Sequence, residues 1–258
     1  MDPNTLLAHF SEQQVAAFFL VLARVSPLFI LAPLFSSKMV NSRVRGIVAV
    51  ALTVGLLPVV KHGEIDLDVL GYAALLVKEV IVGLAFAFAL QAMFAALQVA
   101  GTLLDTLIGF SFGAIVDPVT GTQSAVIQQV YSLFGVAIFI ALGGDAKVIA
   151  GLARTYNAVP LLDAPVISTM VEGVQVAFSG IFVAAFMIAA PVLIAIVIVD
   201  AAFGVVSKVV PQMNIFAVGF PAKMIVGLTL IGASLPFVSG FVGNQVDTSI
   251  WQAIATLK

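Results

Sequence analysis

Long stretches without a charged residue dominate this chain, and most are broken by proline or glycine or bounded by a single ionisable residue. A helix of about 25 residues reaches roughly 37 Å, which is enough to cross the hydrocarbon core of a lipid bilayer. The chain is therefore too apolar to fold in water, yet too often interrupted to form a plain bundle of lipid-facing helices. The uncharged stretches cover residues 25–35, 80–104, 118–144, 173–199 and 224–246.

Composition narrows the class of protein further. Hydrophobic residues make up 62% of the 258 positions and charged residues only 9%, whereas an ordinary soluble domain has roughly 25% charged residues. The 11 basic and 13 acidic residues give a net charge of -2, and they form no basic cluster that would bind nucleic acid. The absence of cysteine excludes disulfides, iron–sulfur clusters and thiolate metal sites.

The hydrophobic pattern divides the chain into about six apolar segments. They cover residues 15–35, 46–60, 69–116, 125–142, 174–199 and 224–246. The third segment is far too long for one crossing, and the more polar stretch 143–172 is expected to form the longest connection. We predict an all-α, polytopic membrane protein of broken helical hairpins, with residues 1–258 forming a single integral membrane domain.

Five ionisable residues lie inside or beside this apolar sequence: Arg24, Lys78, Glu79, Asp105 and Asp200. A charge at the centre of a membrane helix costs about 2.5–3.5 kcal/mol on insertion scales, so each of these residues needs a partner or water. They can mark helix ends and pair locally, or they can face another subunit or a water-filled space. We favour the second interpretation for Arg24, Lys78 and Glu79, and both interpretations stay open for Asp105 and Asp200.

A stretch rich in glycine and phenylalanine follows Asp105, and residues 109–121 read GFSFGAIVDPVTG. Irregular backbone at membrane depth is tolerated only where it is buried in protein or lines a cavity. The stretch is therefore either a loop that can block a pore and swing aside, or a packed turn between helices. Its first five residues are Gly109, Phe110, Ser111, Phe112 and Gly113.

No pattern of residues supports catalysis. The sequence GFSFG matches the G-x-S-x-G pattern of serine hydrolases, but on that fold the histidine base follows the nucleophile, and His9 and His62 both precede it. The chain has neither an HExxH zinc motif nor a G-x-x-x-x-G-K-[ST] phosphate-binding loop. We expect no enzymatic activity, no metal and no cofactor, with any energy for transport supplied by a partner or an ion gradient.

The most distinctive run is residues 208–223, KVVPQMNIFAVGFPAK. Pro211 and Pro221 end or kink helices, Asn214 can hydrogen-bond its own backbone, and Gly219 permits a positive φ. The run predicts a capped re-entrant or interfacial turn, which serves either as a linker or as a docking surface.

This run resembles the signature of the FliR/YscT/SpaR family of type III export gate proteins. The residues that carry the resemblance are Lys208, Pro211, Asn214, Phe216, Gly219, Pro221 and Lys223. Further matches stand in the family's order over about residues 15–225: Arg24 with Pro27 and Pro33, Arg43 with Arg45, Lys78 and Glu79 before Gly83, and Asp105 before residues 109–121. The form Gly219-Phe220-Pro221 is more similar to flagellar than to injectisome members.

The resemblance implies a core subunit of the flagellar type III export gate in the bacterial inner membrane, at the flagellar basal body. In that family the subunit joins FliP and FliQ in a hetero-oligomeric helical channel for unfolded flagellar proteins. FlhB surrounds the cytoplasmic entrance, and other basal-body export proteins complete the machinery. The family's channel-blocking loop corresponds to residues 109–113, and neighbouring subunits as well as membrane lipid would cover the apolar helices.

Three alternatives differ from a flagellar conduit: an injectisome export gate subunit, a secondary transporter and a purely structural scaffold. A secondary transporter predicts an inverted repeat and a compact polar site at broken helices, and the sequence shows neither. A scaffold differs from a conduit because its residues would never contact the exported cargo.

Overall fold

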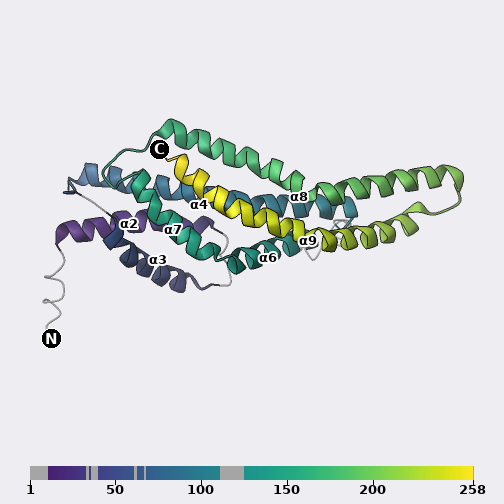
Figure 1. Ribbon diagram of the computed structural model, residues 1–258, viewed down its shortest axis with the longest axis horizontal. Coiled ribbons are helices and arrows are strands. Elements are labelled where there is room, and N and C mark those ends of the chain that lie inside the picture. The colour runs from purple at the N-terminus through teal and green to yellow at the C-terminus, as the bar shows by residue number, and fades with distance from the viewer. Residues whose placement is uncertain are drawn as a thin grey trace. The chain divides into compact units, whose positions relative to one another are not determined.

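A computed structural model describes residues 11–32, 35, 40–60, 63–66, 68–110 and 125–257, apart from the side chains of residues 215 and 216. Within this part of the chain the regular elements are all helices (Figure 1). They are α2 (Glu12–Leu31), α3 (Ser42–Leu56), the 3-10 helix η1 (Leu57–Val59), α4 (Val69–Ile108), α6 (Val126–Ala141), α7 (Gly144–Ala158), α8 (Ile167–Val209) and α9 (Ile215–Ala255).

The described residues include five helices that are long and apolar enough to cross a membrane, or six if α6 and α7 count as one broken span. The prediction of an all-α polytopic membrane protein is confirmed. Helices α4, α8 and α9 have 40, 43 and 41 residues, which corresponds to roughly 60 Å each. Because a hydrocarbon core is only about 30 Å thick, none of these three helices can lie wholly inside it in an upright orientation.

The prediction that residues 143–172 form a connection is wrong for most of that range, because α7 occupies residues 144–158 and α8 begins at Ile167. Helix α7 is amphipathic: Val148, Leu152 and Tyr156 are buried on one face, whereas Asp145 and Arg154 are exposed. A helix with one polar face has a low mean hydropathy, so hydropathy alone does not distinguish it from a connection.

The turn predicted for residues 208–223 is shorter than expected and covers only residues 210–214 between α8 and α9 (Figure 1). Asn214 caps α9, because its Oδ1 accepts a hydrogen bond from the backbone N–H of Ala217 (3.2 Å). Pro221 lies inside α9 instead of ending a helix, as is tolerated in membrane helices where neighbouring groups satisfy the freed backbone.

Contacts divide the chain into two compact units. Unit 1 comprises Met1–Gln91, Gly143–Ala177 and Val246–Lys258, and unit 2 comprises Ala92–Leu142 and Phe178–Gln245. Each of the three long helices therefore contributes one part to each unit.

Unit 1 contains a buried apolar cluster of Val82, Val159, Met170 and Leu257, to which α4, α8 and the segments after α7 and α9 contribute. The start of α2 also holds the connection between η1 and α4. The Gln13 side chain donates to the carbonyl oxygen of Ile65 (3.0 Å) and accepts from its N–H (2.7 Å).

In unit 2, aromatic side chains pack in the interior, and large apolar side chains also cover part of the exterior. Phe94 of α4 and Phe139 of α6 pack edge to face, with ring centroids 5.4 Å apart. On α8, by contrast, large side chains point outward, and Phe178, Phe186 and Ile194 are 56%, 55% and 62% exposed. An apolar surface of this extent requires cover from lipid or from another protein.

Candidate functional site

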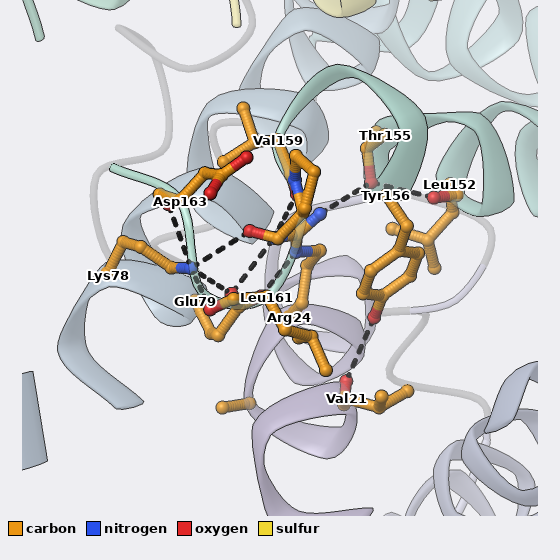
Figure 2. A network of polar contacts seen from close by, with 12 residues as sticks. Val21, Arg24, Lys78, Glu79, Leu152, Thr155, Tyr156, Val159, Leu161 and Asp163 are labelled. Carbon is orange, nitrogen blue, oxygen red and sulfur yellow. Dashed lines mark hydrogen bonds and ion pairs between the residues drawn. The ribbon is translucent and has the colours of Figure 1, made fainter. Parts of the chain in front are cut away.

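Arg24 of α2 lies at the centre of a polar network inside unit 1, and neither its side chain nor that of Glu79 on α4 is exposed (Figure 2). Its guanidinium makes two parallel hydrogen bonds to the Glu79 carboxylate, from Nε to Oε2 and from Nη2 to Oε1 (2.9 Å for the second). A bidentate pair of this kind fixes the relative orientation of the two side chains and also compensates their charges.

The remaining faces of Arg24 are also occupied. Nη2 donates to the carbonyl oxygen of Val159 (2.9 Å), and Nη1 donates to Oγ1 of Thr155 (3.3 Å). The ring of Tyr156 lies 4.2 Å from the guanidinium carbon, within range of a cation–π interaction. Tyr156 in turn donates from its hydroxyl to the carbonyl oxygen of Val21 (3.5 Å), one turn before Arg24.

Lys78 joins the same network from the neighbouring position on α4. Its ammonium lies 2.7 Å from Oε1 of Glu79. It also donates to three backbone carbonyls of the segment after α7, those of Pro160 (3.3 Å), Leu161 and Asp163 (3.2 Å). Lys78 and Arg24 therefore fasten residues 159–163 to α2 and α4, with Glu79 balancing part of their charge (Figure 2).

Gly83 explains how α2 and α4 approach closely enough for this pairing. A Cβ atom at Gly83 would lie 2.3 Å from the carbonyl oxygen of Arg24, far below van der Waals contact. Because the obstructing atom belongs to the backbone, only glycine allows the two helices to pack at this distance. Gly83 therefore lies four residues after Glu79 for a geometric reason, because the close approach that it permits brings Arg24 within reach of the Glu79 carboxylate.

Asp105 lies in the last turn of α4 in unit 2 and is fully buried. Its Oδ1 accepts from the backbone N–H of Ile127 and its Oδ2 from that of Gln128, each at 3.0 Å. These amides belong to the first turn of α6, so the carboxylate caps another helix. Gly101 permits this approach, since a Cβ there would lie 2.4 Å from the Cα of Gln128.

Asp200 of α8 and Lys223 of α9 form an ion pair (2.5 Å) that joins the two helices in unit 2. The Asp200 side chain is 47% exposed and that of Lys223 is 22% exposed. Lys223 also donates to the carbonyl oxygen of Leu107 at the end of α4 (3.5 Å). Contact of Asp200 or Lys78 with another subunit stays a prediction.

Other signature and loop residues lie at the surface, are buried without a charge, or fall outside the described residues. Lys208, Pro211 and Pro221 are exposed, Gly219 is buried, and the Phe216 side chain lies outside the described residues. Gly109 follows α4 with a φ of 102°, which favours glycine, and Phe110 is half-buried. The rest of the loop motif, namely Ser111, Phe112 and Gly113, lies outside the described residues.

The chemistry of these networks is structural. Each buried charge is already bonded to protein groups, and the described residues contain no cluster of three metal-ligating side chains. The partners that sequence reasoning missed are mostly backbone carbonyls and amides, together with Thr155 and Tyr156. Neither residue belongs to a motif, so no sequence signal indicates that both face Arg24.

Residues 15–249 match the model of a family described as bacterial export proteins, family 1. The flagellar biosynthetic protein FliR of Escherichia coli (strain K12) is 28% identical over 87% of this chain and 86% of its own length. FliR of Bacillus subtilis (strain 168) is 29% identical over 91% of this chain and 92% of its own length. The surface presentation of antigens protein SpaR of Shigella sonnei is 26% identical over 82% of each chain.

Proposed function

Because this chain belongs to family 1 of the bacterial export proteins, we propose that it is a core subunit of the flagellar type III protein export gate. It would form, with FliP and FliQ, the inner-membrane channel through which unfolded flagellar proteins leave the cell. The observation that carries this proposal is the similarity to FliR proteins of two distant bacteria over about nine-tenths of the chain.

The surface of the chain supports assembly with other subunits. Charged groups are paired inside each unit, while large apolar side chains of α8 remain exposed. An exposed surface rich in phenylalanine and isoleucine requires apolar cover, which helices of FliP and FliQ or lipid would provide. FlhB at the cytoplasmic entrance, other basal-body export proteins and a place in the flagellar basal body belong to the same proposal.

In this proposal the chain performs no chemical step and acts as a gated conduit. The plug is formed by Gly109, Phe110, Ser111, Phe112 and Gly113, which the resemblance identifies with the family's channel-blocking loop. Apolar phenylalanine side chains in a narrow pore can exclude water and ions by dewetting. Glycine on either side of them allows the backbone to move when a cargo chain arrives.

A gate subunit of an injectisome is the second candidate, favoured by the similarity to SpaR of Shigella. The flagellar assignment rests on the two higher FliR identities and on the form Gly219-Phe220-Pro221. Both candidates share the same channel and differ only in the proteins that are exported.

The test is to express this chain in a flagellated bacterium whose own FliR has been deleted. A tagged copy should restore secretion of hook protein and motility, and should purify in a fixed ratio with FliP and FliQ. The empty vector and an injectisome strain lacking SpaR are the controls. A chain that purifies alone and takes up a small solute into liposomes would instead be a secondary transporter, and the proposal would be abandoned.

A further inference from the structure

The last turn of α4 in unit 2 is held from two sides by charged side chains. Asp105 accepts hydrogen bonds from the backbone amides of Ile127 and Gln128, at the start of α6. Two residues further along α4, the carbonyl oxygen of Leu107 accepts from the ammonium of Lys223 on α9. The two side chains carry opposite charges: the Asp105 carboxylate binds amides of α6, and the Lys223 ammonium binds a carbonyl of α4.

Each charge matches the helix end that it touches. The free N–H groups at the start of a helix carry partial positive charge, and the free carbonyls at its end carry partial negative charge. The Asp105 carboxylate meets the start of α6, and the Lys223 ammonium meets the end of α4. The pair therefore stabilises both helix ends that flank residues 109–125.

Packing of α9 against α4 supports the same junction. Gly227 follows Lys223 by one helical turn and lies on the same face of α9. A Cβ atom at Gly227 would lie 2.6 Å from the side chain of Ile108, the last residue of α4. The ion pair of Lys223 with Asp200 adds α8 (2.5 Å), so four helices of unit 2 meet at the end of α4.

We propose that Asp105 and Lys223 are positioning residues that hold the base of residues 109–125, where the chain leaves α4 and enters α6. Asp105 joins the two ends of this connection, and Lys223 joins its first end to the α8–α9 hairpin. The signature lysine Lys223 thereby couples that hairpin to the last turn of α4, from which residues 109–113 follow in the sequence. The gating part of this inference rests on the proposed function, in which residues 109–113 form the plug.

The geometric test uses cysteine pairs, because the chain has no cysteine of its own. Cysteines at Thr106 and Gln129, both exposed, are cross-linked with a short bismaleimide in the assembled gate. We expect Asp105→Ala to lower the initial cross-linking rate about fivefold, as loss of a helix cap would separate the two ends. An unchanged rate in an assembled gate would overturn the proposal.

Two further variants keep this test decisive. If Asp105→Ala does not accumulate, Asp105→Asn retains the shape of the side chain but only one of the two acceptor oxygens, and a smaller fall in rate is expected. Thr102→Ala on the same helix is the control, since the exposed Thr102 hydroxyl donates only to the carbonyl oxygen of Gln98 (2.9 Å). Its cross-linking rate should equal that of the parent.

The functional test measures leakage of a small solute into cells that assemble the whole gate. Lys223→Met should raise leakage several-fold at unchanged amounts of complex, and Lys223→Arg should restore most of the barrier because it keeps the cation. A role in stability alone would change the amount of complex but not the leakage per complex, which would overturn the positioning role.

The double variant Phe110→Ala, Phe112→Ala separates this proposal from the proposed function. If that variant leaks and Lys223→Met does not, the positioning role fails while the plug stands. If neither leaks, the plug itself fails, and the gating part of the inference fails with it.

Discussion

At the scale of single residues, the Arg24 network accounts for three charges that would be costly in a membrane protein. A buried ion pair gains little net stability because desolvation offsets the attraction, but removing one partner leaves an uncompensated charge. In unit 1, Glu79 balances part of the charge of Arg24 and Lys78, and backbone carbonyls bind the remaining donors. Glu79 is therefore the residue whose loss the network tolerates least.

We predict that Glu79→Gln lowers the free energy of unfolding by about 3–5 kcal/mol, because two cations then share a buried site without a counter-ion. Unfolding of the purified protein in detergent, followed by the fluorescence of the single tryptophan Trp251, measures the loss. Combining this change with Arg24→Met should cost less than the sum of the single changes. Strict additivity would show that the two residues do not act as a pair.

The control is the exposed ion pair between Lys147 and Asp247, whose side chains are 41% and 56% exposed at an N–O distance of 2.9 Å. Asp247→Asn should change the free energy of unfolding by at most about 1 kcal/mol, since solvent screens an exposed pair. A loss as large as that of Glu79→Gln would refute the argument from burial.

At the scale of helices, close backbone approach decides which side chains can pair. Helix α4 has such contacts in both units: Gly83 faces the carbonyl of Arg24, and Gly101 faces the backbone of Gln128. Each of these glycines lies within five residues of the carboxylate that bonds across the same contact, Glu79 in unit 1 and Asp105 in unit 2. Small residues thus bring the helices together, and charged residues hold them in register.

We predict that Gly83→Ala weakens the packing of α4 on α2 by about 1–3 kcal/mol, because its Cβ would overlap backbone atoms. Gly71→Ala on the same helix is the matched control, since nothing lies within 4 Å of its Cβ position. That change should be neutral or stabilise the helix by up to about 1 kcal/mol. The measurement is the thermal stability of the two variants in detergent, and equal stabilities would contradict the prediction.

At the scale of the whole molecule, burial is distributed in an unusual way. Charged groups occupy the interior of each unit, whereas α8 exposes large apolar side chains along its length in unit 2. A soluble protein shows the opposite arrangement. Internal pairing therefore compensates the buried charges, and cover from lipid or other subunits removes the apolar surface from water, as expected of one component in a membrane assembly.

We predict that Phe110→Ala with Phe112→Ala raises the leakage of a small solute in cells that assemble the complete gate. The large apolar side chains are expected to exclude water from the channel, and alanine is too small to do so. Phe110→Leu with Phe112→Leu is the control, because leucine keeps a bulky apolar group, and its leakage should stay near the parent level. Equal leakage in all three strains would remove the plug from the mechanism.

The class of fold could be predicted from the sequence because hydropathy is a property of consecutive residues. The all-α membrane character was predicted correctly, and the resemblance to the export gate family on residues 208–223 agrees with the family match over residues 15–249. Hydropathy did not predict helix α7, because charged residues alternate with the residues of its buried face. The continuation of α9 through Pro221 could not be predicted either, because proline disfavours the interior of a helix.

The sequence by itself determined that Arg24, Glu79 and Asp105 needed partners, because an ionised group in apolar surroundings costs several kcal/mol wherever it lies. Only the tertiary structure decided who those partners are. Arg24 binds the carbonyl of Val159, and Asp105 binds the amide of Ile127. Every residue except proline offers the same backbone donor and acceptor, so no residue type marks the one that folding brings within reach.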